Sequence, residues 1–542
     1  MATVSILHFL VLLLRLSIST SSPQQAHESF LNCLSIHLPG HNLSQLIYTP
    51  NTPSYSSLLL SSIQNLRFTS SANPLLIISP EDALAIQASV ICCKKHSLLI
   101  RIRSGGHDYE GLSYRSDDGD GRFVMLDLAK LRSVNVDIRR STAWVQSGAT
   151  IGELFYKIGK SSRYHGFPAG SCPTVAIGGQ VSGGGLGRLA RKYGMAADSV
   201  LDAELVDANG RLLDRASMGE ELFWAIRGGG GASFGVIISW NLGLVGVPHN
   251  VTVVTLHKTK KNEAIQLVYK WQYIAHKLHE DLYLKVDIIS KQGKKRGAEA
   301  VFIALFLGRC SELLYHMEKS FPGLGVERED CREMSWIESV IYFAGYTNGE
   351  PIEILVDRSL QPKEYNKGKS DYVKDPIPLR EWEGIWEMFS KEGAGSMYLN
   401  PQGGRMSRIS ESEIPYPHRQ GNLYNIQYLV RWKESGDVAS KKHLSWIRDM
   451  YRYMSPYVSK NPRAAYINFR DLDLGKNEKG NSSYSKAQVW GRKYFKDNFR
   501  RLAMVKSKVD PDEVFWNEQS IPPFTERIYF KELMAYNGSD TT

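Results

Sequence analysis

The sequence predicts an α+β protein with two domains, and three observations lead to this prediction. The chain has 542 residues, 42% of them hydrophobic and 23% charged, which is more apolar material than one domain usually buries. Short strand-like runs alternate with helical segments in the first half, and glycines cluster at 178–185 and 228–231. From about Val251 longer amphipathic segments rich in Trp, Tyr and Lys follow, which predicts a second domain with a sheet and covering helices.

The first half is expected to alternate between helices and short strands. Residues 29–38 and 55–66 are predicted helices, and Pro80-Glu81-Asp82 opens a third that runs to Lys95, because proline and acidic residues favour a first helical turn. A further helix is predicted at 151–160, and strands at 98–103, 123–128, 142–146 and 200–206. From about Asn461 we expect glycine-poor strands and loops that lead to a basic helix ending near Lys508.

Residues 1–22 have the pattern of a secretory signal peptide. Residues 7–16 are almost entirely apolar, and residues 17–22 are small and polar, as a cleavage region should be. This run is too short to span a bilayer, and no later run reaches the roughly 18 apolar residues of a membrane helix, so we expect no stable membrane anchor. Four glycosylation motifs agree with the secretory route, to the extracellular space (apoplast) or the vacuole: Asn42, Asn250, Asn481 and Asn537.

Charge and cysteine content exclude other classes of protein. The formal net charge is +10, but the basic residues are scattered rather than gathered in one patch, so we expect no nucleic-acid partner. The six cysteines are too few for a disulfide scaffold. Because they include no Cys-x-x-Cys pair, we expect no metal site. We expect one structural disulfide among them.

A glycine-rich turn follows the predicted strand at 98–103. Ser104-Gly105-Gly106-His107 exposes backbone N–H groups that could hold a pyrophosphate, and an ordinary tight turn is the alternative. Gly183-Gly184-Gly185-Leu186-Gly187 is no dinucleotide-binding fingerprint, because it does not follow a clear strand and no acidic residue stands about 20 positions later. The residues of this turn are therefore equally compatible with a loop that binds a nucleotide phosphate and with an ordinary structural turn.

A series of segments resembles the berberine bridge enzyme family, which belongs to the p-cresol methylhydroxylase/vanillyl-alcohol oxidase (PCMH/VAO) fold group. The segments stand in the family's order over roughly residues 28–525: 104–114, 167–175, 222–230, 333–340, 415–428 and 470–475. The resemblance implies a two-lobed PCMH/VAO-type FAD-binding domain over residues 28–250 and a substrate domain over 251–460 with an antiparallel sheet covered by helices. A C-terminal segment, 461–525, is then expected to return to the FAD domain.

The resemblance implies that FAD is attached at two residues, His107 and Cys172. Two attachments hold the ring and raise its potential, which favours a flavin that accepts hydride. The remaining cofactor contacts implied by the resemblance are Arg103, Ser104, Gly105, Gly106, Asp108, Gly170, Ser171, Thr174, Val175, Gly178, Gly179, Gln180, Ser182, Gly183, Gly184, Val236 and Asn468.

Two further expectations come from the resemblance. A disulfide is expected between Cys33 and Cys92, which leaves three buried thiols at Cys93, Cys310 and Cys331. Val175 stands where the family sets oxygen access to the flavin, and a small branched residue there is similar to the oxygen-reactive members. O₂ is therefore the expected electron acceptor.

The candidate catalytic residues are Tyr109, Gln427, Tyr466 and Arg431. Chemistry of the family type needs a base that takes a substrate proton as hydride leaves to the flavin. Gln427 stands where related enzymes hold Glu or Gln, and a neutral amide can orient a substrate but cannot accept its proton. Tyr109, beside the attachment residue His107, is similar to a tyrosine that assists such chemistry.

The chain also departs from the family's pattern around the expected substrate pocket. Phe469 stands where many members carry a tyrosine that accepts a proton, and Gln180 stands where a flavin-tuning histidine is common. The expected pocket residues are Gln402, Asn425, Phe469 and Glu299.

Three functions fit these observations. The first is a covalent-FAD oxidase of a plant secondary metabolite, phenolic, alkaloid or similar, with or without oxidative cyclisation. The second is an FAD-containing cyclase of Diels–Alder type, with Gln427, Arg431 and Arg405 as hydrogen-bond donors. The third is a non-catalytic flavoprotein.

Overall fold

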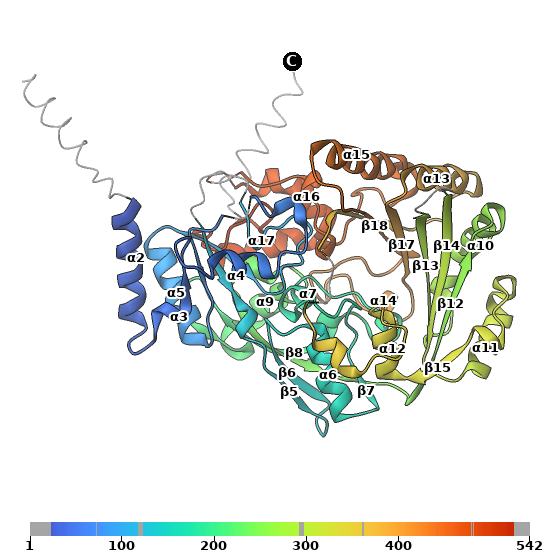
Figure 1. Cartoon of the computed structure of the whole chain (residues 1–542), viewed down its shortest axis with the longest axis horizontal. Helices are drawn as coiled ribbons and strands as arrows, with labels where there is room; N and C mark the ends of the chain where they lie inside the picture. Colours follow the sequence, from blue (N-terminus) through green and yellow to red (C-terminus); the bar gives the residue numbers. More distant parts are fainter. Residues whose placement is uncertain are drawn as a thin grey trace, which may run out of the picture.

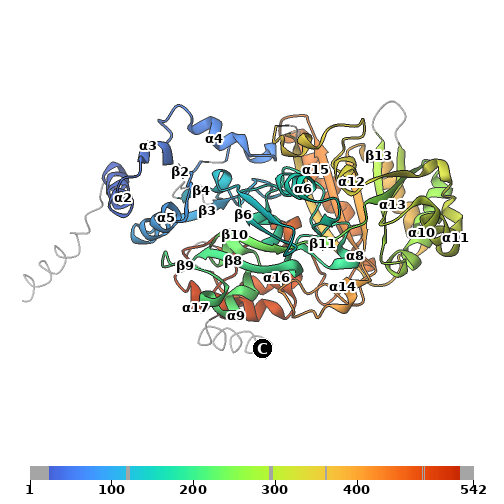
Figure 2. The ribbon, with the colours of Figure 1, turned by 90° about the horizontal axis from the view of Figure 1, so that it is seen from below.

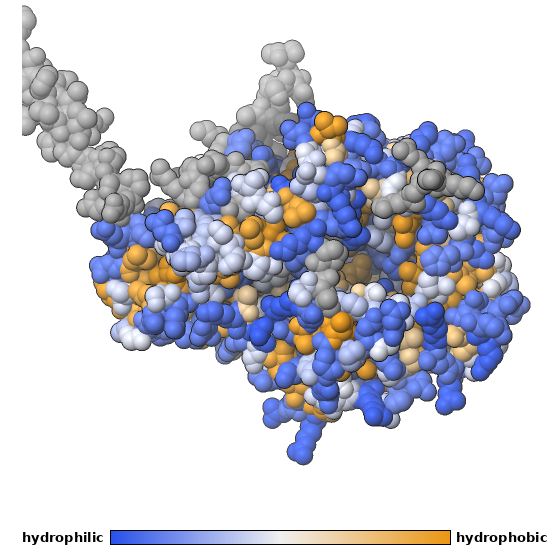
Figure 3. All heavy atoms as spheres, viewed as in Figure 1, coloured by the Kyte–Doolittle hydropathy of each residue, from blue (hydrophilic) through white to orange (hydrophobic). Residues whose placement is uncertain are grey.

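The structure is a computed structural model that describes residues 23–71, 73–116, 123–291, 297–359, 363–478, 480 and 482–524. The predicted signal peptide and the acceptor residues Asn481 and Asn537 lie outside the described residues. Hydrophilic side chains are spread over the face of the molecule in Figure 3, interrupted by separate apolar patches. Within the described ranges, no helix combines the length and the apolar character needed to cross a membrane.

The N-terminal part contains a four-stranded sheet with the order β1 (Ile47–Tyr48), β2 (Leu76–Ile78), β4 (Phe123–Asp127) and β3 (Leu99–Arg103). The strands β2, β4 and β3 run parallel, and α5 (Ala83–Lys95) is capped by the Asp82 carboxylate. A disulfide from Cys33 to Cys92 joins α2 (Pro23–His37) to α5 with a Cα–Cα distance of 5.9 Å, which confirms this pairing. The helix predicted at 55–66 is shorter in the structure, where α4 spans Tyr55–Ser61.

A second, antiparallel sheet completes the first half of the chain. Its order is β5 (Val134–Asp137), β6 (Thr142–Gln146), β10 (Val236–Gly243), β8 (Val200–Val206) and β9 (Leu212–Leu213). The helix α6 (Ile151–Ser161) begins with a capping box formed by Thr150 and Glu153, which satisfies its first free N–H groups. The shorter α7 (Ile177–Ser182) and the helix α9 (Arg215–Ile226) also belong to this part of the chain.

The second half is built on a seven-stranded antiparallel sheet (Figure 1). Its order is β15 (Arg332–Ser335), β12 (Asn250–Lys258), β14 (Gly297–Phe306), β13 (Leu282–Lys291), β17 (Gly395–Pro401), β18 (Tyr424–Trp432) and β16 (Tyr365–Val373). One face forms a core with the helices α10 (Lys261–Ile274), α13 (Leu379–Glu392) and α15 (Asp437–Tyr453). Because side chains alternate along a strand, the intervening residues of β13, β17 and β18 point to the other face.

Two features of the second half differ from the prediction. Cys310 and Cys331 form a second disulfide, with a Cα–Cα distance of 5.9 Å, and are therefore not thiols as expected. The prediction missed this pair because the resemblance supplied only one pairing. In the C-terminal part no described residue from 461 onward belongs to a strand: single turns of 3₁₀ helix lead to α16 (Tyr484–Phe495) and α17 (Asn498–Val509).

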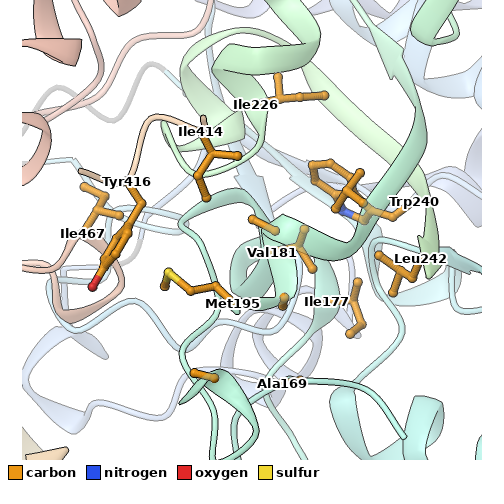
Figure 4. Packing of buried hydrophobic residues seen from close by; sticks show 14 of the residues in the cluster. Ala169, Ile177, Val181, Met195, Ile226, Trp240, Leu242, Ile414, Tyr416 and Ile467 are labelled. Carbon is orange, nitrogen blue, oxygen red and sulfur yellow. The ribbon is translucent and has the colours of Figure 1, made fainter. Parts of the chain in front are cut away.

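Residues from the C-terminal half pack into the core of the first half. Tyr416, Ile414 and Ile467 lie near Val181 and Met195 in one buried cluster (Figure 4). In the view of Figure 2, α17 lies beside α9, and α17 contacts both α9 and α16. The C-terminal segment therefore shares a core with the glycine-rich region.

A buried ion-pair network ties three distant segments together. Lys367 and Lys369 of β16 each place Nζ 2.6 Å from a carboxylate oxygen of Asp471, and Lys367 also pairs with Glu110. All four side chains are almost fully buried. Breaking such a network leaves an uncompensated buried charge, so it holds the seven-stranded sheet, the C-terminal segment and the segment that follows His107 in a fixed arrangement.

Candidate active site

A cavity of about 880 Å³ lies between the glycine-rich first half and the face of the seven-stranded sheet that the helices α10, α13 and α15 do not cover. One wall comes from the turn after β3, the segment 170–180 and α7, and the opposite wall comes from β13, β17 and β18. Residues 466–470 of the C-terminal segment complete the lining. Its size is within the usual range for small-molecule and cofactor sites.

Most of the predicted cofactor and catalytic residues are brought together in this cavity. Those that line it are Ser104, Gly105, Gly106, His107, Asp108, Tyr109, Gly170, Ser171, Cys172, Thr174, Val175, Gly178, Gly179, Gln180, Ser182, Gly183, Gln427, Arg431, Tyr466, Asn468 and Phe469.

The glycines allow two segments of the first half to pack backbone against backbone. A Cβ on Gly106, whose φ is +70°, would lie 2.0 Å from the carbonyl oxygen of Ser62, and a Cβ on Gly105 would lie 2.7 Å from the amide nitrogen of Ala176. Both contacts are too short for any other residue. At Gly179, by contrast, a Cβ would meet no protein atom within 4 Å, and this exposed glycine leaves space in the cavity beside α7.

His107 and Cys172 converge on the hydroxyl of Thr174. The His107 Nε2 atom lies 3.0 Å from Thr174 Oγ1, and the Cys172 Sγ atom lies 3.6 Å from the same oxygen. Burial lowers the pKa of His107 to about 4, and a hydrogen bond with the Thr174 backbone opposes this shift only in part. The imidazole is therefore neutral at physiological pH, so a ring nitrogen keeps the lone pair that a covalent bond to carbon requires.

Tyr109 connects the two walls of the cavity. The amide of Gln427 on β18 donates a hydrogen bond to the Tyr109 hydroxyl at 2.8 Å. The Tyr109 ring meets Phe469 edge to face, with 6.2 Å between centroids. Burial raises the pKa of Tyr109, while the positive charge of Arg431 opposes this rise. Tyr109 is thus an oriented hydroxyl beside the attachment segment, and Arg431 is the cation that eases its ionisation.

Tyr466 has a different environment. Its hydroxyl oxygen accepts hydrogen bonds from the Gly185 N–H at 2.8 Å, the Leu186 N–H at 3.1 Å and the Asn468 amide at 3.1 Å. Asn468 also donates to the carbonyl of Gln180 at 3.0 Å. Burial raises the pKa of Tyr466 to about 12. Because three donors occupy its hydroxyl oxygen, this residue holds the glycine-rich loop in place.

The sheet contributes cavity residues that the motifs did not identify. Tyr283 and Lys285 of β13, Tyr398 and Asn400 of β17, and Leu429 of β18 line the cavity together with Gln427 and Arg431. Their two-residue spacing is the signal in the sequence, because alternate residues of a strand share one face. The spacing alone does not say which face meets a cavity. Arg188, which follows the glycine-rich loop, was also missed, and no feature of the sequence distinguishes it.

Three predicted pocket residues do not line the cavity. The side chain of Gln402 is fully buried, and its backbone carbonyl accepts a hydrogen bond from Arg191 at 3.1 Å. Asn425 is also fully buried and donates to the carbonyl of Asp371 at 3.0 Å. Glu299 lies on β14, where its carboxylate pairs with Lys291 at 3.7 Å.

Three predicted cofactor contacts also lie outside the lining. Arg103 is fully buried and binds the carboxylate of Asp127 at 2.6 Å, so its guanidinium stabilises the four-stranded sheet. Val236 points into the hydrophobic core of the first sheets. Gly184, with φ +112°, lies behind the lining next to Met195. Arg405, considered as a donor for cyclase chemistry, is exposed on α14 (Arg405–Arg408) and is likewise absent from the lining.

The residues of this cavity fit a bound FAD. The two predicted attachment residues stand at one hydroxyl, and backbone groups next to glycines line the adjoining space. Among the described residues, two buried hydroxyls of the lining, Ser113 and Ser147, have no hydrogen-bond partner. Buried polar groups are almost always satisfied, so these hydroxyls indicate a polar ligand.

Comparison with known proteins agrees with this geometry. Residues 74–215 match an FAD binding domain family, and residues 465–522 match the family described as berberine and berberine like. The chain is 51% identical over 517 residues to tetrahydroberberine oxidase of Berberis wilsoniae, covering 94% of this chain and 96% of that protein.

Solved structures give the same result. A structure of berberine bridge enzyme-like protein 28 of Arabidopsis thaliana is 46% identical and superposes with a TM-score of 0.87, covering 92% of this chain and all of that one. A grass pollen allergen with glucose dehydrogenase activity, Phl p 4, has the same identity, TM-score and coverage. The predicted α+β, PCMH/VAO-type fold is therefore confirmed.

Proposed function

The chain belongs to the berberine bridge enzyme-like family of FAD-binding proteins, and on this premise we propose that it is a covalent-FAD oxidase of a small plant metabolite. One observation carries the proposal: His107 and Cys172, 65 positions apart in the chain, both lie within reach of the Thr174 hydroxyl on the cavity wall. This arrangement supports the attachment of one ring at both residues. Phenolic, alkaloid and similar compounds are the proposed substrates.

FAD held in this cavity would accept a hydride from a substrate carbon, and O₂ would then take the electron pair and two protons to give H₂O₂. The chain must position the substrate and provide a group that takes the proton the substrate loses along with the hydride.

We assign that proton route to Tyr109. Gln427 fixes the direction of its hydroxyl through the 2.8 Å hydrogen bond, and Arg431 opposes the effect of burial on its pKa. The alternatives are weaker, because Phe469 has no group that accepts a proton and the Tyr466 hydroxyl is occupied by three donors. Val175 lines the cavity and is proposed to admit O₂.

We also propose that the protein follows the secretory route. Two disulfides, Cys33–Cys92 and Cys310–Cys331, are typical of an oxidising compartment. The acceptor residue Asn42 is exposed at the start of a short helix, where a glycan would not disturb the core. Loss of apparent mass after treatment with a glycosidase would support this proposal, and an unmodified Asn42 in protein from a plant host would count against it.

The cofactor proposal is tested by acid precipitation of the purified protein followed by mapping of the flavin-bearing peptides. We expect yellow precipitate and adducts on the peptides that contain His107 and Cys172. Release of all flavin into the supernatant would refute covalent attachment. Oxidase function is tested separately: a substrate added without oxygen should bleach the flavin, and air should restore the colour and yield peroxide.

A cyclase of Diels–Alder type is the second candidate, and Phe469 favours it because the ring replaces an ionisable group beside Tyr109. The same experiment separates the candidates. Conversion of a diene and an enone without bleaching would support the cyclase, and the absence of any conversion by a flavin-loaded protein would favour a non-catalytic flavoprotein.

A further inference from the structure

Five lysine and arginine side chains line the cavity in the described part of the chain, and they differ in whether a carboxylate neutralises them. Three have such a partner: Arg101 lies 3.0 Å from Glu518, Arg470 lies 3.1 Å from Asp108, and Lys285 lies 2.7 Å from Asp287. For the other two, Arg188 and Arg431, no described carboxylate lies within 4.0 Å.

Arg188 is fixed in position without a counter-ion. One of its terminal nitrogens donates to the Ser171 hydroxyl, and its guanidinium stacks 3.8 Å from the centre of the Phe343 ring. Its Nε atom is buried and has no hydrogen-bond partner among the described residues. Burial lowers the pKa of Arg188, and the Asp287 carboxylate opposes this shift only from beyond ion-pairing distance.

Arg431 extends the positive region along the sheet. It donates to the Tyr398 hydroxyl at 3.2 Å, and Lys285 lies 5.2 Å from the centre of the same ring, so Tyr398 stands between two cations. Glu364 also lines the cavity, but it acts on Arg431 only from beyond ion-pairing distance.

The two arginines lie at the end of the cavity where the flavin ring would be attached. Arg188 contacts Ser171, the residue before Cys172, and the charge of Arg431 acts on Tyr109, two residues after His107. The phosphates of FAD must lie at the other end of the cofactor. They cannot contact groups at the ring attachment, so the arginines are available to a substrate.

Building on the proposed oxidase function, we propose that Arg188 and Arg431 form an anion-recognition subsite and that the substrate carries a carboxylate on an aromatic body. A guanidinium binds a carboxylate through two parallel hydrogen bonds, which gives orientation as well as affinity. The rings of Tyr283, Phe343 and Tyr398 line the same region and provide flat apolar surface. The same charges oppose a protonated amine, so the inference narrows the proposed substrates to aromatic carboxylic acids and away from basic alkaloids.

The test uses the flavin-loaded protein and three probes with one phenolic ring: p-coumarate, its neutral primary amide, and tyramine. Each probe is titrated against the visible absorbance of the oxidised flavin to obtain a Kd. We expect p-coumarate to bind at least about tenfold more tightly than the amide, since hydrogen bonds to charged groups are about twice as strong as neutral ones, and tyramine to bind least tightly.

Arg188→Gln and Arg431→Gln should each remove most of the preference for the carboxylate while changing affinity for the amide by less than about twofold, because each removes one charge-assisted contact. The matched control is Arg452→Gln, an exposed arginine of α15 paired with Asp449, which should leave all three affinities unchanged. Equal affinity for p-coumarate and its amide, or tighter binding of tyramine, would overturn the inference.

Two outcomes separate this inference from the proposed function. A protein that carries flavin but does not prefer the carboxylate refutes the subsite alone. A protein that carries no covalent flavin refutes the proposed function. If Arg188→Gln instead loses its flavin while Arg431→Gln does not, Arg188 serves the cofactor and the subsite is wrong.

Discussion

Replacing Thr174 by valine should slow the attachment of flavin at both His107 and Cys172. The Thr174 hydroxyl lies 3.0 Å from His107 Nε2 and 3.6 Å from Cys172 Sγ, and valine keeps the shape of the side chain but removes that oxygen. The change therefore perturbs the two reacting groups through one atom. The backbone of Thr174, which also contacts His107, remains in place.

The magnitude follows from the lost contact. The hydrogen bond to His107 is worth about 1 kcal/mol, and the weaker sulfur contact contributes less. If these contacts orient the two groups for attack, the rate of attachment falls about fivefold, because about 1.4 kcal/mol corresponds to a factor of ten. We expect the fraction of doubly attached protein to fall at early times and to recover on long incubation.

Intact-protein mass spectrometry of samples taken during incubation with FAD measures this rate, since unattached, singly attached and doubly attached chains differ in mass. Thr174→Ser is the matched control, because serine restores the oxygen, and it should attach flavin at nearly the normal rate. Equal rates for Thr174→Val and the unmodified chain would show that the hydroxyl does not orient the two groups and would refute the reasoning.

Three further predictions concern catalysis and stability. Tyr109→Phe should lower kcat by about a hundredfold or more while leaving the flavin content unchanged, because it removes a general acid or base; an unchanged kcat would exclude Tyr109 from the proton route. A Cys310→Ala/Cys331→Ala double variant should lose about 3 kcal/mol of unfolding free energy, from the loop of 21 residues that the disulfide closes, and an unaltered denaturation midpoint would contradict this. Burial lowers the pKa of His418 to about 3 in the folded protein, below its ordinary value of 6.5, so the stability that depends on the neutral ring is complete above pH 6.5 and is lost as the pH falls toward 3. His418→Gln should therefore lose less Tm than the unmodified chain between pH 7 and pH 4; equal losses would show that this histidine does not titrate as inferred.

Local elements were predictable because the information for them is local. The glycine positions, the capping residues Thr150 and Glu153, and the apolar run of β3 specify a turn, a helix start and a strand through contacts within a few residues. The family motifs likewise placed His107 and Cys172 in one site although the chain between them is long. By contrast, the strands expected after residue 461 were wrong: that stretch forms 3₁₀ turns and loops that lead to α16 and α17, and α17 packs against α9.

Errors at the site have a common cause. Asn425, Gln427, Leu429 and Arg431 alternate along β18 and share one face, yet Asn425 lies fully buried beyond the cavity while the other three line it. Gln402 was expected at the cavity from its position in the family pattern, but it lies behind the end of the sheet. The position of a residue along a strand determines its face, and it does not determine what lies opposite that face.

By itself the sequence determined the α+β class. Its resemblance to the family, carried by motifs that stand in order along the chain, implied the Cys33–Cys92 disulfide and the identity of the flavin-attachment candidates. Only the tertiary structure decided that one Thr174 hydroxyl lies next to both candidates and that the outer face of the seven-stranded sheet closes the cavity. It also decided that Arg188 and Arg431 have no carboxylate partner among the described residues. The reason is that α10, α13 and α15 cover one face of the sheet, and this packing leaves the opposite face, with its alternate residues, toward the glycine-rich half. Contacts between segments this far apart arise from the packing of whole layers, which no local pattern of residues records.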